Sequence, residues 1–402
     1  MLKNNFIFKK TNISLVLFLT LVLISGSTLT AQADEAEAEL LEEFLTTEEM
    51  DEEHFSSEIL AEFSPAELLN LRDDFNSELG EYISYEKLEP HLYEIFYTEG
   101  RMEMQFVVIE EEIAGLRFLD VVEDATDIEE AISDFRELPG ERSLLLTKNG
   151  EEMHSINPEQ KLAVGSTFKL AVLDTIQEEI ETGNLSCSDV IELKPEDRSL
   201  PSGRLQDWPE SVTFTVHSLA GRMISQSDNT ATDMLFRKVG RRNIEERLEI
   251  DDPLLQTREF FILRDPEREE FVQEYREADR QEKYEILNQL ENSELPGVEI
   301  MNEVYARDIE WYLNVEQLKR LMENVQHLDI MTINPGPVNS RPWSRVAYKG
   351  GASPGALNYT HYFMDEEGNE YFLSATWNHE QELEQSEFDR IYSGIVNSLI
   401  DN

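Results

Sequence analysis

Cysteine and basic residues are scarce in this chain. Its single cysteine, Cys187, cannot form an intrachain disulfide, so packing alone must hold the fold together. Only 34 lysines and arginines stand against 84 aspartates and glutamates, which leaves a formal net charge of −50. So negative a surface repels nucleic acids and anionic membranes, and the sequence predicts neither as a partner. We interpret the acidity as an adaptation to high salt, where screening tolerates dense like charge.

Motifs for metals and cofactors are also missing. The seven histidines are spread without H-x-H or H-E-x-x-H spacing, which argues against a metal site. No glycine-rich phosphate loop or dinucleotide fingerprint occurs. We therefore expect no metal and no cofactor, and any catalysis must use the side chains of the chain itself.

The N-terminus has the three parts of a secretory signal peptide. Three lysines at positions 3, 9 and 10 precede an apolar run over residues 13–24, and Ala31-Gln32-Ala33 offers a cleavage site. The apolar run is shorter than the ~20 residues that a bilayer requires. No cysteine follows it that could carry a lipid anchor. We predict that residues 1–33 are removed by a cut after Ala33, giving a secreted or periplasmic protein without a stable membrane anchor.

An acidic stretch and a small domain follow. Residues 34–62 are rich in acidic residues with scattered leucines, and we interpret them as an acidic linker with transient helix. Residues 63–125 predict a small α+β domain of one helix and a strand meander. This domain carries no convincing catalytic group, so we expect binding, spacing or dimerisation there, with a protein partner that the sequence does not identify. Its predicted elements are a helix over 64–80, capped by Ser64 and Pro65, and strands at 91–97, 101–109 and 114–122.

The rest of the chain, residues 126–402, predicts a second and larger α+β domain. Strand runs at its start and end enclose a long region of helical pattern. This order implies an antiparallel sheet whose first and last segments meet around an inserted helical lobe. The predicted elements are a helix at 127–138, two strands around an Asn149-Gly150 turn, helices within 168–249 and 264–326, strands at 345–349, 357–364 and 371–377, and a final helix with Phe388 and Tyr392.

A serine lies three residues ahead of a lysine in the stretch "LAVGSTFKLAVLDTI". On a helix, positions i and i+3 share a face, so the Lys169 amine can reach the Ser166 hydroxyl. A free serine is a weak nucleophile that needs a base, and a lysine can be that base if burial or a neighbouring cation lowers its pKa. The same spacing occurs at Ser84 and Lys87 among charged residues, and we interpret that copy as chance on a surface or loop.

Two further motifs follow in order along the chain. Ser227-Asp228-Asn229 comes 61 residues after Ser166, directly before an apolar helical pattern. The triplet Lys349-Gly350-Gly351 stands at a strand end, where missing side chains let a substrate lie along the edge. S-x-x-K, S-D-N and K-[ST]-G in this order are the signature of serine penicillin-recognising enzymes.

On these motifs, within "AVGSTFKLAVL", "MISQSDNTATDML" and "YKGGASPG", the chain from about residue 138 resembles class A-type serine β-lactamases and penicillin-binding proteins. With the domain before it, it looks like two-domain serine hydrolases in which a cystatin-like, isomerase-like or NTF2-like domain precedes a β-lactamase-like one. The resemblance implies a serine β-lactamase/transpeptidase-like fold, an antiparallel sheet flanked by helices plus an all-α lobe.

The resemblance also implies roles for individual residues. Ser166 would attack a carbonyl and become acylated, with Lys169 as general base. Ser227 would relay the proton to the leaving group, and Asn229 would hold the amide side chain of the substrate together with Lys169. Lys349 would bind a substrate carboxylate. Asp228 we expect to stabilise the fold rather than to act as an acid.

The strand edge after Lys349 would line the substrate site. The backbone N–H groups of Ser166 and Ala352 would form the oxyanion hole. Gly350 departs from the family pattern, because the hydroxyl that usually follows the lysine is missing. We expect Ser353 to compensate. The substrate-binding residues predicted on this edge are Gly350, Gly351, Ala352 and Ser353.

The deacylation step has no clear residue in the sequence. Class A enzymes place a glutamate on a loop after the S-D-N helix, within an E-x-x-x-N pattern. In "LLQTREFFILRDPEREEF" the expected position falls near Leu263, no matching asparagine follows, and Glu259 is the best substitute. In so acidic a chain, an isolated glutamate is usually a solvated surface residue.

These residues predict an exported serine hydrolase that forms an acyl-enzyme, with a β-lactam as the leading substrate. An esterase or a D-alanyl-D-alanine peptidase would use the same serine on an ester or amide substrate. In a different class, a penicillin-binding envelope sensor would be acylated once and not turned over.

Overall fold

The computed structural model describes residues 30–47, 49–98, 100–109, 112–123, 128–248, 250, 252–290, 293–302 and 304–400. Its contacts divide the chain into two units: Met1–Ala131 with Ser393–Asn402, and Ile132–Tyr392. All but the last four residues of the predicted signal peptide lie outside the described residues, as does the predicted domain boundary at residue 125. In the described part of the chain, no helix is long and apolar enough to span a membrane.

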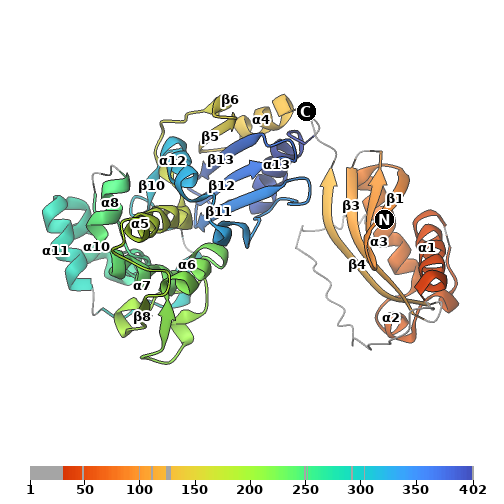
Figure 1. The fold of residues 1–402 in the computed structure, drawn as a ribbon, viewed down its shortest axis with the longest axis horizontal. Coiled ribbons are helices and arrows are strands. Elements are labelled where there is room, and N and C mark those ends of the chain that lie inside the picture. Colours follow the sequence, from red (N-terminus) through yellow and green to blue (C-terminus); the bar gives the residue numbers. More distant parts are fainter. Residues whose placement is uncertain are drawn as a thin grey trace, which may run out of the picture. The chain divides into compact units, whose positions relative to one another are not determined.

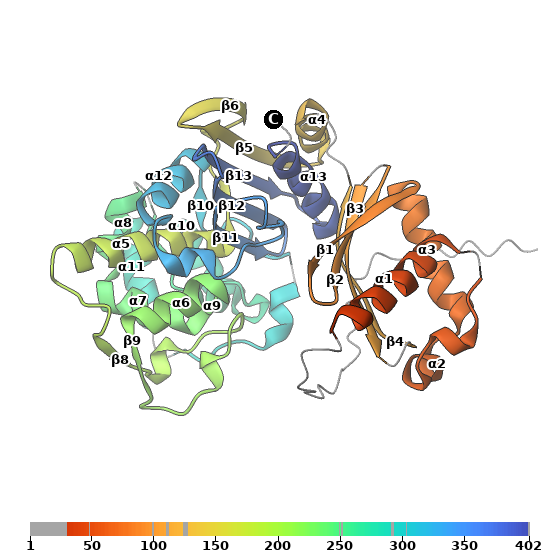
Figure 2. The ribbon, with the colours of Figure 1, turned by 45° about the vertical axis from the view of Figure 1, so that its right-hand side comes forward.

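The first unit is a four-stranded antiparallel sheet with helices on one face (Figures 1 and 2). The predicted helix is confirmed as α3, where Ser64 and Glu67 form a reciprocal capping box and Pro65 takes the first turn. The strand meander is also confirmed. The elements are α1 (Thr30–Thr46), η1 (Glu52–His54), α2 (Ser57–Glu62), α3 (Pro65–Leu79), β1 (Tyr82–Glu89), β2 (Leu92–Tyr97), β3 (Gly100–Ile109) and β4 (Glu112–Glu123).

The interpretation of residues 34–62 as an acidic linker is wrong, because this segment forms α1, η1 and α2. Leu41 and Phe44 of α1 and Phe55 after η1 are buried in the core of the first unit. Arg72 of α3 donates hydrogen bonds to the carbonyl oxygens of Phe44 (2.8 Å) and Thr47 (2.6 Å), which satisfies the C-terminal end of α1. Apolar residues at helical spacing therefore outweigh the acidic composition of the stretch.

The strand β1 was not predicted, and it contains the second S-x-x-K copy. Ser84 and Lys87 are three positions apart on a strand, so their side chains point to opposite faces. Lys87 instead pairs with the buried Glu37, with Nζ 3.3 Å from Oε1. The interpretation of this copy as chance is confirmed, although the segment is a strand and not a loop.

The second unit is built on a five-stranded antiparallel sheet in the order β11-β12-β13-β5-β6. Strand β13 near the end of the chain pairs with β5 near the start of the unit, with Leu373 opposite Leu146. This confirms the prediction that first and last segments meet around an inserted lobe. Asn149 and Gly150, both at positive φ, make the predicted hairpin turn. The strands are β5 (Glu141–Lys148), β6 (Glu151–Ile156), β11 (Arg345–Ser353), β12 (Ala356–Met364) and β13 (Glu370–Asn378).

Helices cover both faces of this sheet. On one face, α13 (Gln385–Asn397) places Phe388 and Tyr392 against Tyr359 of β12. On the other, α12 (Val315–Val325) packs on β12, β13 and β5 and joins an all-α lobe (Figure 1). The other helices are α4 (Ile128–Glu137), α5 (Lys169–Glu181), α6 (Val216–Ser225), α7 (Asn229–Val239), α8 (Arg241–Leu248), α9 (Thr257–Leu263), α10 (Glu269–Glu277) and α11 (Arg280–Leu290).

Short strands and 3₁₀ turns lie between the longer elements of this unit. Strand β7 pairs with β10, and β8 pairs with β9. The charged region after Arg264 is part of the lobe, because Val272, Ile286 and Leu290 are buried in the same core cluster as α5 and α7. The short elements are β7 (Leu162–Ala163), β8 (Val190–Glu192), β9 (Thr213–Thr215), β10 (Tyr312–Leu313), η2 (Gly165–Phe168), η3 (Pro195–Asp197), η4 (Leu205–Asp207), η5 (Pro266–Arg268), η6 (Val298–Asn302) and η7 (Asp329–Thr332).

Candidate active site

Ser166 lies on a short 3₁₀ turn, η2, that leads into α5. The turn is anchored by Phe168, whose ring stacks on Trp311 with centroids 4.2 Å apart. Positions i and i+3 of a 3₁₀ turn are eclipsed, so Ser166 and Lys169 remain on one side although α5 itself begins at Lys169. The Ser166 residue is half-buried, whereas Lys169 is fully buried.

The buried amine of Lys169 is fixed by three acceptors. It donates to the Ser227 carbonyl oxygen (2.6 Å), the Ser227 Oγ (3.1 Å) and the Asn229 Oδ1 (2.6 Å). A protonated lysine has three N–H donors, so none is left for the Ser166 hydroxyl. A neutral amine would have two donors and one lone pair, and that lone pair could accept the serine proton.

Burial favours this neutral form. Desolvation lowers the pKa of Lys169 well below its usual value of 10.5, and the neighbouring positive charge of Lys349 lowers it further. Asp233 and Asp228 act in the opposite direction. The environment therefore gives Lys169 the property that a general base at neutral pH requires.

Ser227 occupies the turn between α6 and α7 in a left-handed conformation, with φ +53. Residues with a Cβ rarely adopt this conformation, so the surrounding structure must hold it. Ser202 donates to the Ser227 carbonyl oxygen (2.7 Å), and Lys169 binds both oxygens of the residue. The strained turn thus directs the Ser227 hydroxyl toward two lysines.

Asp228 stabilises this turn, as the sequence predicts. It is fully buried and caps α7 by accepting from the Ala231 backbone N–H (2.8 Å). It also accepts from the backbone N–H groups of Arg204 (2.8 Å) and Leu205 (3.1 Å). Asn229 next to it accepts from Lys169 and donates through Nδ2 to the Leu200 carbonyl oxygen (2.9 Å).

Lys349 reaches the same hydroxyl from β11. Its Nζ lies 3.2 Å from Ser227 Oγ and also donates to the Gly350 carbonyl oxygen. Burial lowers the pKa of Lys349 to about 7. The two amines therefore share one serine oxygen, and Lys169, Ser227, Asn229 and Lys349 form a single hydrogen-bonded cluster.

The backbone of β11 approaches η2 closely at two glycines. A Cβ on Gly351 would overlap the Val164 carbonyl oxygen and lie 2.7 Å from the Ser166 and Thr167 nitrogens. Gly165 has φ +50, and a Cβ there would lie 3.0 Å from the Ala352 nitrogen. The two segments fit only because both positions lack side chains, and this brings the expected oxyanion-hole residues, Ser166 and Ala352, onto adjoining stretches of backbone.

Ser353 does not stand in for the hydroxyl missing at Gly350. Its Oγ donates to Oε2 of Glu310 (2.7 Å), whose side chain is buried and pairs with Arg264 at 3.2 Å. That expectation is wrong because the Ser353 hydroxyl is committed to a buried carboxylate. Sequence reasoning also missed Glu310, which no motif distinguishes from the many other glutamates.

Glu259, the best sequence candidate for a deacylation base, is held in an ion pair. Its Oε1 accepts from Arg241 Nη2 (2.6 Å), and its Oε2 accepts from the Gln256 backbone N–H (2.8 Å) as part of a cap on α9. The carboxylate is buried, so it is neither a solvated surface group nor a free base. The structure therefore corrects the assignment of Glu259, which has a structural role.

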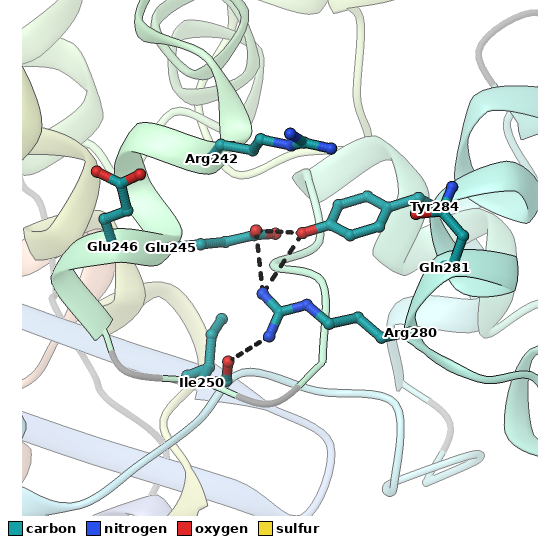
Figure 3. A pocket seen from close by; sticks show the side chains of 7 residues that line it. All are labelled: Arg242, Glu245, Glu246, Ile250, Arg280, Gln281 and Tyr284. Carbon is teal, nitrogen blue, oxygen red and sulfur yellow. Dashed lines mark hydrogen bonds and ion pairs between the residues drawn. The ribbon is translucent and has the colours of Figure 1, made fainter.

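A separate pocket of about 510 Å³ lies between α8 and α11 (Figure 3). Its polar groups satisfy one another: Glu245 accepts from Arg280 Nη2 (3.3 Å) and from the Tyr284 hydroxyl, and Arg280 also donates to the Ile250 carbonyl oxygen (2.9 Å). None of the predicted site residues lines it. We therefore place the candidate active site at Ser166 and not in this pocket.

Ser166 on its tight turn, together with the hydrogen-bonded cluster of Lys169, Ser227 and Lys349, supplies the residue types that a serine acyl-transfer site requires. Residues 125–291 match the family model of the Beta-lactamase enzyme family. Over 99 residues the chain is 28% identical to β-lactamase VEB-1 of Pseudomonas aeruginosa, a match that spans 24% of this chain and 33% of that relative. Residues 125–291 are therefore similar to the β-lactamase enzyme family, and the chain spans about a third of the length of the curated relative that it matches.

The chain was also compared with solved structures, and two of the similar ones are β-lactamases. A β-lactamase from Sphaerobacter thermophilus has 16% sequence identity and a TM-score of 0.45, covering 68% of this chain and 95% of that one. An ancestral class A β-lactamase has 13% identity and a TM-score of 0.49, covering 68% of this chain and 98% of that one.

Proposed function

We propose that this protein is an exported serine hydrolase that becomes acylated at Ser166, with a β-lactam or a related amide as the acyl donor. The observation that carries the proposal is the convergence of Lys169 and Lys349 on the Ser227 hydroxyl, at 3.1 and 3.2 Å, beside the turn that bears Ser166. The family match supports the class of reaction.

The proposed acylation returns Lys169 and Ser227 to the protonation states in which they began. Neutral Lys169 takes the Ser166 proton as Oγ bonds to the substrate carbonyl carbon. The Ser166 and Ala352 N–H groups stabilise the oxygen that becomes negative. Ser227 then donates its proton to the leaving nitrogen as the C–N bond breaks, and recovers a proton from Lys169. Lys349, while protonated, attracts a substrate carboxylate.

A second candidate function is a penicillin-binding sensor that is acylated without turnover. The engagement of both Glu259 oxygens favours it, because the ion pair with Arg241 and the cap on α9 hold this buried carboxylate in a structural role. Incubation with penicillin G, a chromogenic cephalosporin and simple esters separates the candidates. A transient adduct with product release supports a β-lactamase, a persistent adduct supports the sensor, and fast ester turnover without ring opening supports an esterase.

Replacing Gly351 with alanine should lower the acylation rate about 10²-fold, the usual cost of losing one oxyanion donor. The new Cβ would meet backbone atoms of Val164 and Ser166, which cannot rotate away, so β11 must move from η2. The matched control is Gly221→Ala on α6, whose Cβ would have Ile330 Cγ2 at 3.9 Å as its nearest neighbour. Stopped-flow kinetics measures the acylation rate of both variants. An unchanged rate in Gly351→Ala would contradict the proposed oxyanion site.

Replacing Glu259 with glutamine tests its structural role. We expect the free energy of unfolding to fall by roughly 3–5 kcal/mol, because Arg241 is left without its buried partner. The deacylation rate of the folded protein should change less than about threefold, since the carboxylate does not act on water. The double variant Arg241→Met/Glu259→Gln should recover part of the stability. A 100-fold slower deacylation with unchanged stability would restore Glu259 as the base.

A further inference from the structure

The space where Gly350 lacks a side chain is filled by a phenol. A Cβ built on Gly350 would overlap the hydroxyl oxygen of Tyr348 and lie 2.7 Å from its Cζ. We propose that the Tyr348 hydroxyl takes the place of the missing hydroxyl after Lys349 and makes this residue a determinant of specificity for substrates with a carboxylate. This inference rests on the proposed acylation at Ser166.

The strand geometry permits this substitution. Tyr348 and Gly350 are two positions apart on β11, so they face the same side, while Lys349 and Gly351 face the other. The face of β11 that carries Lys349 and Gly351 lies against Ser227 and η2. The Tyr348 hydroxyl therefore reaches the backbone of β11 at Gly350 from the face opposite to Lys349, at the point where a Ser or Thr side chain at position 350 would begin.

The Tyr348 ring is held in that place by its neighbours. It stacks on His361 of β12 with centroids 4.4 Å apart and an interplanar angle of 29°. Gly336, at φ +72, allows the loop before β11 to approach the ring, since a Cβ there would lie 2.8 Å from ring carbons. A ring fixed on both sides loses little freedom on binding, which favours preorganised recognition.

The hydroxyl itself is available for a ligand. In the part of the chain that the structure describes, it has no hydrogen-bond partner, and it is not among the fully buried unpartnered oxygens. The hydroxyl of nearby Tyr359, in contrast, donates to Asp389 (2.5 Å) and accepts from Gln385 (3.0 Å). Burial raises the pKa of Tyr348, so the phenol stays protonated and can donate to a carboxylate.

The test compares penicillin G with its methyl ester, whose carboxylate is masked. Tyr348→Phe removes only the hydroxyl, and we expect the ratio of kcat/KM for penicillin G over the ester to fall about tenfold, the effect of one hydrogen bond to a charged group. A rise in KM with little change in kcat should carry the loss. Tyr359→Phe is the matched control, which should lower stability through its lost partners without changing the ratio.

Moving the hydroxyl provides a second test. Tyr348→Ala clears the space, and Gly350→Thr added to it should regain most of the lost ratio. If penicillin G acylates the wild type but the ratio in Tyr348→Phe stays within about twofold, the role of Tyr348 is wrong while the acylation stands. If neither compound acylates the wild type at Ser166, the proposed function fails and this inference fails with it.

Discussion

Ser166→Ala should abolish acylation by penicillin G and reduce any hydrolytic turnover by at least about 10⁴-fold, because the proposed mechanism forms the covalent bond on the Ser166 hydroxyl. The side chain is small and half-buried, so its loss should leave the fold intact. Burst-phase kinetics and initial rates measure the effect.

The chain supplies its own control for this substitution. Ser84 has the same spacing to a lysine but lies exposed on β1. Ser84→Ala should keep the wild-type rate within about twofold. Equal activity in the Ser166→Ala and wild-type proteins would contradict every acyl-enzyme reading of the site.

Lys169→Met should slow acylation on the order of 10³-fold, since it removes the proposed general base. In the wild type the rate should rise with pH as Lys169 loses its proton, at a pH well below 10.5. For a carboxylated substrate the rate should fall again above the pKa of Lys349, about 7, as that positive charge is lost. Both amines contact Ser227, so the titration of one affects the other. The apparent pKa values from the rising and falling parts of the pH profile therefore belong to the pair of lysines and not to either residue alone. A Lys169→Met variant with the wild-type rate and pH profile would exclude Lys169 as the base.

Stability gives an independent measure of the lowered pKa. The unfolded chain keeps Lys169 protonated up to about 10.5, whereas the folded chain releases that proton at lower pH. The unfolded state therefore binds more protons in this interval, and the free energy of unfolding should increase with pH there. Lys169→Met should reduce this slope in urea titrations at several pH values, and an unchanged slope would mean that Lys169 titrates normally.

The second unit was predictable because its signals are local and agree with one another. Asn149 and Gly150 mark a hairpin, and apolar residues follow strand and helix periods on either side of them. The first unit was less predictable from the sequence. The high charge of residues 34–62 predicts disorder, yet Leu41 and Phe44 are buried in a core shared with strands that come later in the chain. The composition of a segment cannot predict such a long-range contact.

In the candidate site, too, local motifs could be predicted from the sequence, whereas long-range contacts could not. Ser166, Lys169, Ser227 and Lys349 are distant in sequence, but ordered motifs identify them, and the last three share direct contacts. The structural role of Glu259 depends on its ion pair with Arg241, and that of Ser353 on its hydrogen bond to Glu310. Both partners are distant in sequence and come close only in the folded chain. Tyr348 was missed although its signal was present, a tyrosine two positions before a glycine where a hydroxyl was expected.

Peptide mapping by mass spectrometry after a brief incubation with penicillin G tests the central claim most directly. One penicilloyl mass should appear on the peptide that contains Ser166, should form more slowly at acidic pH, and should be absent from Ser166→Ala. An adduct on another residue, or an unmodified protein after prolonged incubation with reactive acyl donors of every class, would contradict the assignment of this cluster as an acylation site.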